Sequence, residues 1–360
     1  MSPDRARRPT LDTVALEVGV SRATVSNAYN RPDQLSPQLR DRIIAAAERL
    51  GYPGPDPTAR SLATQRTGSV AFLLGQGLSS AFSDPALSIM LDSLASTVDS
   101  GDRALLLLPG VNDLGPRPES VARAQTDVVV AYSLPDRAPA LDAVRQRKLP
   151  LVVVDQPVVP GSARVEVDDT GGAELAARHV GELGHRRVGI LAFGLSPDGK
   201  HGPASPARVQ SARYRVTRDR VAGYLRGLAQ FGIDPDSVPL WEARCGDQHL
   251  GREGARWLMT RSPRPTALLC MSDELALGAI RAARELGLSV PSEVSVVGFD
   301  DTPGASWSDP PLTTIRQDLV DKGRRIADLA LRLLDGARPG QPTTLSVELV
   351  PRASTAPPPA

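Results

Sequence analysis

The sequence is poor in several residue types, and each shortage excludes a class of protein. Its 360 residues include only two cysteines, Cys245 and Cys270, too few for a disulfide framework or a cysteine-rich zinc site, so both are expected in the core. No apolar run approaches the ~20 residues that a membrane span needs. The N-terminal segment is basic, but no apolar stretch follows it, so we expect no secretory signal and a cytoplasmic location.

Lysine is also scarce, and the charge is unevenly distributed. Only three of the 42 basic residues are lysine: Lys148, Lys200 and Lys322. Residues 1–66 hold ten arginines and seven acidic residues, a net charge of +3, whereas the remainder holds 32 basic and 34 acidic residues, a net charge of −2. A basic end on a nearly neutral body gives weak support for a nucleic-acid contact at that end.

Two kinds of pattern divide the chain. Residues 10–50 contain no strand-like run and are expected to form short helices, whereas from Ser69 onward short β-rich runs alternate with longer helical segments. Such alternation is typical of parallel sheets with helices on both faces, and the number of units predicts two α/β lobes. The expected strands span residues 69–74, 104–108, 128–131, 151–155, 187–192, 267–271 and 294–299. The expected helices span residues 85–99, 139–147, 171–183, 219–231, 251–261, 273–286 and 319–334.

Two segments of this body show no clear periodicity. Residues 196–218 combine Gly, Pro, His and several Arg, and we interpret them as a long loop, which is uncommon in a compact domain and often functional. The last residues, 353–360, end in Ala-Pro-Pro-Pro-Ala and are expected to be a disordered tail.

The N-terminal region carries the most specific pattern in the chain. Gly19 follows a first amphipathic helix at the position where a helix end favours positive φ, and Val20 fills the corner. Ser21 suits the N-cap of a second helix over residues 22–29, and residues 37–50 form a third amphipathic helix. Two short helices joined by a tight turn and braced by a third predict an all-α helix-turn-helix headpiece. The helical spacing of the first helix rests on Leu11, Val14, Ala15 and Val18.

The same residues resemble the lactose-repressor (LacI/GalR) family of bacterial transcription regulators. The matching positions are Thr10-Leu11, Val14-Ala15, Gly19-Val20-Ser21, Thr24-Val25-Ser26 and Asn30, followed by Ala46-Ala47 and Leu50-Gly51-Tyr52. The resemblance implies a homodimeric repressor that binds a pseudo-palindromic operator in double-stranded DNA, with no catalytic activity, cofactor or metal.

Within this resemblance, individual residues take individual roles. Arg22, Ala23 and Asn27 fall where the family contacts base edges, since Arg can bond to guanine and Asn to adenine. The hydroxyl and amide groups of the second helix suit phosphate contacts, as do Arg31 and Arg40. The expected DNA-contacting residues of the headpiece are Thr10, Ser21, Arg22, Ala23, Thr24, Ser26, Asn27 and Asn30.

A second DNA element is implied after the headpiece. Residues 57–66, PTARSLATQR, resemble the family's hinge helix, which folds on operator DNA when two copies pair. Ala59 and Leu62 are its expected contacts, with Leu62 as the apolar wedge that kinks the minor groove. The spacer at residues 53–56 has one residue more than the usual family form, which is expected to affect headpiece placement.

The remaining body resembles the periplasmic-binding-protein-like core of the same family. The matching runs are SDELALGA at 272–279, VPSEVSVVGFDD at 290–301 and PPLTTI at 310–315. We therefore expect a headpiece (1–54), a hinge (55–68), a small-molecule effector-binding core (69–352) and the tail. The expected first lobe comprises residues 69–167 and 313–340, and the expected second lobe comprises residues 168–312 and 341–352.

An effector cleft is expected beyond the carboxyl ends of the strands. Asp155, Asp273 and Asp300 each follow or end a predicted strand, where they suit a hydroxyl-rich or amine-bearing ligand. By resemblance, Arg220 clamps the effector, opposite Asp300. Gln248 stands where the family often has a stacking aromatic, so Phe82 or Trp307 are candidates to replace it, and a sugar or related metabolite is the family expectation.

Two other classes of protein each account for only part of the sequence. An enzyme is disfavoured because Gly75-Gln76-Gly77 lacks the third glycine of a dinucleotide fingerprint and the four histidines lack metal-ligand spacing. A carboxylate pair for acid–base chemistry stays open, since the three aspartates are expected to converge. A small-molecule binding protein without a DNA role would account for the core but not for residues 10–66.

Overall fold

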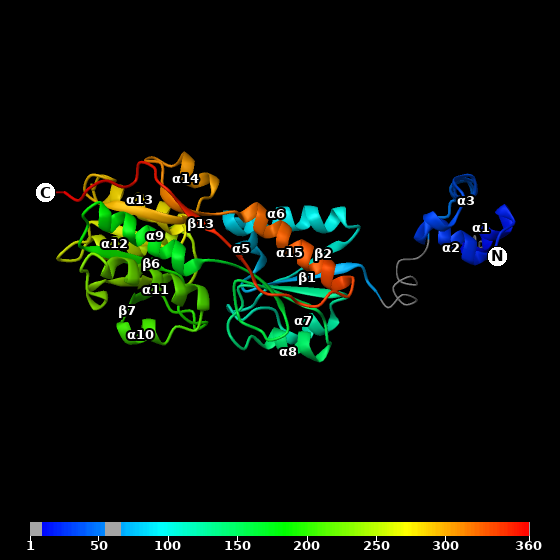
Figure 1. Ribbon diagram of the computed structural model, residues 1–360, viewed down its shortest axis with the longest axis horizontal. Helices are drawn as coiled ribbons and strands as arrows, with labels where there is room; N and C mark the ends of the chain where they lie inside the picture. The colour runs from blue at the N-terminus through cyan, green and yellow to red at the C-terminus, as the bar shows by residue number, and fades with distance from the viewer. Residues whose placement is uncertain (1–8, 55–65, 360) are drawn as a thin grey trace, which may run out of the picture. The chain divides into compact units, whose positions relative to one another are not determined.

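The computed structural model describes residues 9–54 and 66–359, which fall into two compact units divided after Thr67 (Figure 1). The hinge contacts Ala59 and Leu62 lie outside the described residues, as does the second half of the long spacer. Within the described parts, no helix is both long and apolar enough to cross a membrane.

The headpiece consists of three helices, α1 (Leu11–Val18), α2 (Arg22–Asn30) and α3 (Pro37–Leu50), with a 3-10 turn at Pro32–Gln34. Gly19 ends α1 with φ of 75°, a left-handed conformation that glycine adopts without steric cost. Ser36 and Ser21 cap α3 and α2, each accepting a bond from a backbone N–H. A single core joins the helices and contains the buried residues Val14, Ala15, Val25, Ala28, Ile43, Ala46 and Ala47.

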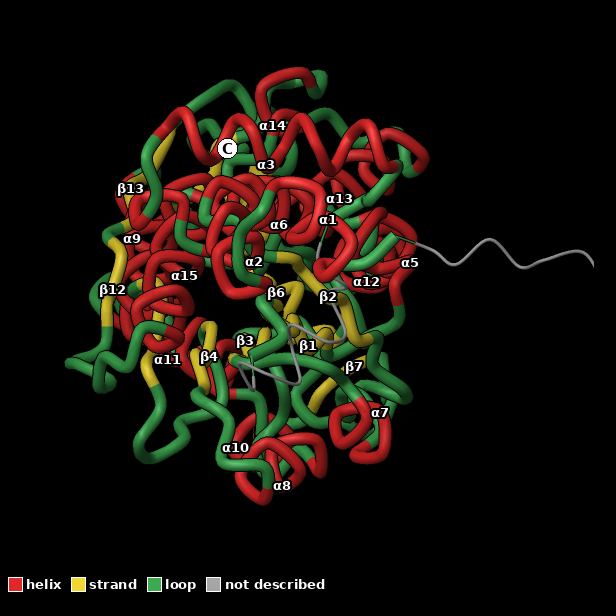
Figure 2. Tube along the Cα trace, turned by 90° about the vertical axis from the view of Figure 1, so that its right-hand side faces the viewer, coloured by secondary structure: helices red, strands yellow, loops and turns green. Residues whose placement is uncertain are grey.

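The second unit begins with a sheet whose six strands are all parallel, in the order β12-β5-β4-β3-β1-β2. Alternate residues of β1 pack on opposite faces: Phe72 contacts the cluster of α6 and α15, and Leu73 that of α7 and α8. Figures 1 and 2 show α7 and α8 on one side of β1 and β3 and α6 on the other. The elements are β1 (Ser69–Leu74), α5 (Leu78–Ser83), α6 (Pro85–Ser100), β2 (Ala104–Leu108), α7 (Pro118–Arg123), β3 (Val128–Tyr132), α8 (Pro139–Gln146), β4 (Leu151–Val154), β5 (Ala163–Val167), α15 (Leu319–Leu334) and β12 (Thr343–Leu345).

The second sheet has seven strands in the order β13-β11-β10-β9-β6-β8-β7, and only its two edge strands are antiparallel. Helix α9 packs with α11, and α12 with α13, around one large core. The elements are α9 (Asp169–Glu182), β6 (Val188–Ala192), β7 (Gly202–Ala204), α10 (Pro206–Gln210), α11 (Arg215–Ala229), a 3-10 turn at Pro235–Ser237, β8 (Leu240–Glu242), α12 (Gln248–Met259), β9 (Ala267–Cys270), α13 (Asp273–Glu285), β10 (Ser295–Asp300), α14 (Pro303–Trp307), β11 (Thr313–Gln317) and β13 (Val347–Val350).

The chain crosses between the two lobes three times, and the last two crossings differ from the expected boundaries. Strand β11 belongs to the second sheet rather than the first, while β12 belongs to the first sheet rather than the second. The crossings therefore follow Val167, Gln317 and Leu345. Strands β11 and β12 are short, and their sheet is set by pairing with β10 and β5, which no local pattern reveals.

The supposed long loop at 196–218 is structured. It contains β7 and α10, and α11 begins at Arg215, four residues before the expected helix start. The Arg208 guanidinium ties the segment to the sheet through Asp198 (2.8 Å) and Glu242 (2.7 Å). An arginine held by two carboxylates stabilises a segment that lacks hydrophobic periodicity, so periodicity alone missed it.

The prediction of a disordered tail is wrong for residues 353–356, which pack onto the second lobe. Ser354 is fully buried, and its hydroxyl accepts a bond from Thr313 N at 2.8 Å. The Ala356 carbonyl accepts from Ser295 Oγ at 3.0 Å and lies 2.9 Å from His185 Nε2. Composition suggested disorder, but the tail's backbone groups find partners at the ends of β10 and β11.

Candidate functional sites

Helix α2 presents an exposed polar face above the headpiece core. Val25 and Ala28 are buried, whereas Arg22 and Ala23 are exposed and Asn27 is half-buried. Residues four apart in a helix lie on the same face, so Ala23 and Asn27 form one side of the helix, opposite the core. Thr24 and Ser26 are also half-buried, and the side chain of Asn30 lies outside the described residues.

Two of the expected DNA-contacting residues are helix caps. The Thr10 hydroxyl accepts from Thr13 N at the start of α1, and the Ser21 hydroxyl accepts from Thr24 N at 3.1 Å at the start of α2. The Ser21 and Thr24 hydroxyl oxygens lie 2.8 Å apart. These bonds fix where the helices begin, and they leave the N-terminus of α2 open to solvent with its backbone dipole directed outward.

Arg22 is the one cation within α2, and it is exposed. Its guanidinium lies 3.8 Å from the Asp12 carboxylate, and both side chains are mostly exposed, at 69% and 64%. An ion pair this long and this exposed contributes little stability, so the arginine can exchange Asp12 for an external partner. The α2 face thus offers a guanidinium, a methyl group and an amide, a set that suits base edges in a major groove.

The second candidate site is a cavity of about 200 Å³ between the two lobes of the core. Its walls come from the carboxyl ends of strands in both sheets, for example Tyr132 at the end of β3 and Asp300 at the end of β10. This is where ligands bind in open α/β sheets. Among the predicted effector residues, the structure brings Arg220, Asp155 and Asp300 into its lining.

Arg220 is held rigidly in the wall of the cavity. Only 4% of it is exposed; its Nε donates to Asp169 Oδ1 at 2.8 Å, and its Nη1 donates to the Met271 carbonyl. The guanidinium carbon lies 3.6 Å from the ring centroid of Phe299, a cation–π contact. Burial opposes the charge on Arg220, but the charges of Asp169 and Asp300 raise its pKa above the ordinary value, so it stays cationic.

A hydrogen-bonded chain joins the lobes along the cavity floor. Asp300 Oδ1 accepts from Gln317 Nε2 at 2.6 Å, and Gln317 Oε1 accepts from Lys322 Nζ at 3.2 Å. Lys322 Nζ in turn lies 2.8 Å from the Asp155 carboxylate. Gln317 ends β11 at a lobe crossing, so this chain links an aspartate of the second lobe to one of the first. Burial raises the pKa of Asp300 well above its usual value.

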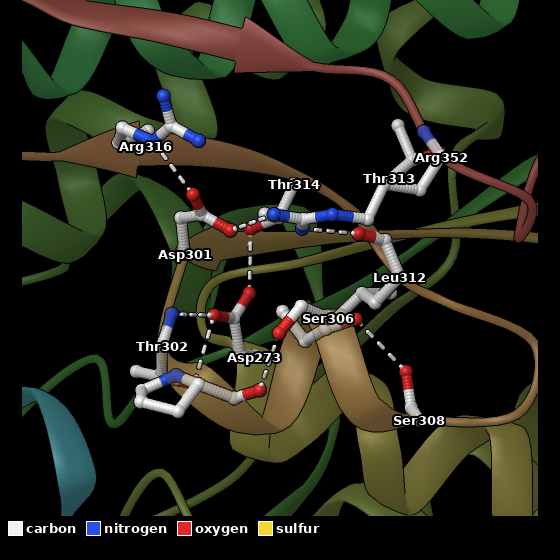
Figure 3. Close-up of polar contacts among 12 residues, drawn as sticks. Asp273, Asp301, Thr302, Ser306, Ser308, Leu312, Thr313, Thr314, Arg316 and Arg352 are labelled. Atoms are coloured by element: carbon white, nitrogen blue, oxygen red, sulfur yellow. Dashed lines mark hydrogen bonds and ion pairs between the residues drawn. The ribbon is translucent and has the colours of Figure 1, made fainter.

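Asp273 is not in the cavity lining, which differs from the prediction that it contacts effector. It is fully buried and accepts bonds from Thr302 N (2.7 Å), Thr302 Oγ1 (3.0 Å) and Thr314 Oγ1 (2.5 Å), as Figure 3 shows. Burial raises its pKa to about 7. Its position at a strand end is as expected, but its carboxylate turns into the lobe and secures the loop after β10.

The expected aromatic and amide contacts also lie away from the cavity lining. Phe82 is 76% exposed on α5 and Trp307 is 83% exposed on α14. Gln248 is exposed and donates to Glu274 Oε2 at 3.0 Å, so it acts on the cavity only through that carboxylate. The aromatic residues of the lining are instead Tyr132, Phe193 and Tyr214.

Sequence reasoning missed several lining residues, three of which left a readable signal. Asp84 precedes Pro85 at the start of a predicted helix, a pattern typical of an N-cap, and its Oδ1 accepts from two backbone N–H groups there. Lys322 stands four residues before the apolar Ile326, so the two residues share the buried face of α15, where a lysine is unusual. Glu274 adjoins the predicted Asp273.

A headpiece with an exposed polar helix, followed by a two-lobed core around a central cavity, is the arrangement of a DNA-binding regulator with a periplasmic-binding-protein-like core. Residues 10–54 match the model for bacterial regulatory proteins of the lacI family, and residues 177–355 match the periplasmic binding protein-like domain. The chain belongs to the LacI family and is a DNA-binding transcription regulator.

Close relatives carry the same description. The chain is 42% identical to an HTH-type transcriptional regulator of Mycolicibacterium smegmatis, over 91% of both chains. It is 40% identical to the HTH-type transcriptional regulator Rv3575c of Mycobacterium tuberculosis, over 100% of both. Among solved structures, the lac repressor dimer bound to operator and the anti-inducer ONPF matches with a TM-score of 0.77 and 25% identity, covering 97% of this chain and 100% of that one.

Proposed function

We propose that this protein is a homodimeric repressor whose binding to a specific operator is controlled by a small-molecule effector in the cavity between its lobes. The observation that carries the proposal is the exposed face of α2, with Arg22, Ala23 and Asn27 directed away from the headpiece core. Arg22 and Asn27 would discriminate bases, whereas Ser26, Asn30 and the capped start of α2 would contact phosphates.

The two-fold symmetry of a dimer supports a pseudo-palindromic operator. The similar lac repressor structure is a dimer on operator DNA, and a two-fold protein dimer matches a pseudo-palindromic site. Each protomer would place one α2 in a major groove. The hinge residues Ala59 and Leu62 would meet their partners in the central minor groove, with Leu62 as the wedge.

The core would act through closure of its lobes. Arg220 and Asp300 lie on one lobe and Asp155 on the other, and all three line the cavity. A ligand that bonds both lobes favours one relative arrangement and shifts the equilibrium between arrangements. Because binding free energies are linked, an effector that weakens operator binding must itself bind more weakly to the operator complex, by the same factor.

The coupling between effector binding and operator binding can be tested with the full-length protein. Neutral sugars, cyclitols, amino sugars and nucleosides would be screened by the shift they cause in melting temperature, and each hit added to an operator titration. We expect a hit to change operator affinity by roughly 5–150-fold, with a reciprocal change in its own affinity. Stabilising ligands that leave operator affinity unchanged would show a binding protein without effector control.

A further inference from the structure

The cavity between the lobes is lined by more carboxylates than cations. Among the described residues its lining contains Asp84, Asp113, Asp155, Glu274 and Asp300, five acidic groups, against the three cations Arg220, Arg244 and Lys322. A cavity with walls of low dielectric focuses the field of such an excess onto anything that enters it. The charge balance therefore bears directly on which ligands the cavity accepts.

Two of the three cations are already neutralised by aspartates. Lys322 is 3% exposed and lies 2.8 Å from the Asp155 carboxylate, and Arg220 bonds Asp169 at 2.8 Å. Arg220 also donates to a backbone carbonyl, which occupies another of its N–H groups. The third cation, Arg244, is exposed, so its charge is largely screened by solvent.

Four lining carboxylates, by contrast, have no cation within ion-pair distance in the described structure: Asp84, Asp113, Glu274 and Asp300. Three of these groups accept hydrogen bonds, each at one oxygen: Asp84 Oδ1 from backbone N–H groups, Glu274 Oε2 from Gln248 and Asp300 Oδ1 from Gln317. The second oxygen of each group is left as an acceptor for a ligand.

These carboxylates come from both lobes and lie within electrostatic reach of one another. Asp84 precedes α6 of the first lobe, whereas Glu274 lies in the first turn of α13 of the second. Burial raises the pKa of both groups, and the charge of Asp84 raises the pKa of Glu274 and of Asp300 further. Closing the cavity on an anion would add a third negative charge between two like charges.

We propose that Asp84 and Glu274 are specificity residues that reject anionic effectors, so that the ligand of this cavity is rich in hydroxyl or amine donors and carries no phosphate or carboxylate. This inference rests on the effector role proposed above. An ammonium group between Asp84 and Glu274, or a pair of hydroxyls on one ligand, would donate to both lobes at once. The same contact that selects the ligand thereby also favours closure.

Cys245 provides a reporter of the field in the cavity that needs no knowledge of the effector. Its thiol donates to Asp247 Oδ2 at 3.0 Å, so the contribution of Asp84 and Glu274 is read from the change between variants, in which Asp247 stays constant. Its thiol lines the cavity and is partly exposed, whereas Cys270 is completely buried. Cationic and anionic methanethiosulfonate reagents of similar size would be reacted with the full-length protein. Labelling at Cys245 would be identified by peptide mass, and the rate with the cationic reagent divided by the rate with the anionic one. This ratio would then be divided by the same ratio measured for a small free thiol. Burial raises the pKa of this thiol to about 12, which slows both reagents alike and leaves the ratio intact.

We expect a normalised ratio of roughly ten in favour of the cationic reagent. Asp84→Asn and Glu274→Gln should each lower it about threefold. Asparagine is as good an N-cap as aspartate, so α6 should persist in the first variant. Asp92→Asn on the exposed side of α6 and Glu253→Gln on α12 are matched controls that should leave the ratio unchanged.

Three outcomes would overturn the proposal. A normalised ratio at or below one, or one that neither cavity variant lowers, would show that these carboxylates do not set the field. Inorganic phosphate that saturably slows labelling of Cys245 by a neutral reagent would show an anion site. Loss of operator control with the charge preference intact would instead count against the proposed function alone.

Discussion

The headpiece and the core of this protein are stabilised in different ways. Seven buried apolar residues form the single hydrophobic cluster of the headpiece, whereas three large clusters flank the two sheets of the two-lobed core. A domain near 50 residues buries too small a fraction of its surface to have stability in reserve. The headpiece therefore depends on helix caps and a few contacts, while the core has enough buried surface to accommodate ionisable groups in its cavity.

The largest effect is expected in the core, where Arg220→Ala should lower stability and abolish effector response without changing the headpiece. Arg220→Ala leaves Asp169 buried without its ion pair, a loss of roughly 3–5 kcal/mol. The core transition in calorimetry should fall markedly, and effector response should disappear, while non-specific DNA affinity of the headpiece stays unchanged. A variant that responds to effector as fully as the unsubstituted protein would remove Arg220 from the site.

Shortening a buried side chain of the headpiece should instead abolish operator binding and leave ligand binding intact. Ile43 is fully buried, and Ile43→Ala is expected to cost roughly 2–5 kcal/mol, enough to unfold a small domain. Operator binding should be lost while ligand binding to the core persists. The control is Ile326→Ala, equally buried in the first lobe, which should lower core stability without unfolding it. Operator binding retained in the Ile43 variant would disprove the marginal stability of the headpiece.

Substitutions on the exposed face of α2 should change base discrimination without changing the stability of the headpiece. Arg22→Ala and Asn27→Ala should each reduce discrimination at one base pair by ~1–3 kcal/mol, with no change in headpiece melting. Arg49→Ala on α3, an exposed arginine paired with Glu17 at 3.6 Å, is the control and should leave base preference unaltered. An unchanged preference profile in both α2 variants would exclude this face as the base reader.

The smallest expected effect concerns the C-terminal segment. Ser354→Ala removes the acceptor of the buried Thr313 N–H and should destabilise the core by roughly 1–2 kcal/mol. Denaturant unfolding should show a lower midpoint with an unchanged slope, since the surface exposed on unfolding stays the same. A midpoint equal to that of the unsubstituted protein would mean that the tail contributes nothing to the second lobe.

Local signals made the headpiece predictable from sequence. Gly19 and Ser21 mark the turn between α1 and α2 by their own backbone preferences, and the structure has both caps where they were predicted. In the core, the buried strand β1 and the half-buried edge strand β2 were also identified at their observed bounds, because apolar β-rich runs between breakers are distinctive.

Features that depend on distant pairing were not predictable. The sheet assignments of β11 and β12 depend on partners far along the chain, and the order at Ser354 depends on Thr313 and Val296. In the cavity, position at a strand end identified Asp155 and Asp300 but could not reveal that Asp273 turns inward to Thr302 and Thr314. Direction of a side chain follows from tertiary contacts, not from its place in the sequence.

Selection of operators from random DNA by the full-length protein tests the central claim most directly. The account predicts a two-fold symmetric site whose affinity falls steeply with salt, as phosphate neutralisation requires, and whose symmetric positions change in the Arg22 and Asn27 variants. Failure to enrich any sequence, with and without the ligands that stabilise the core, would contradict the assignment of α2 as a reader of operator DNA.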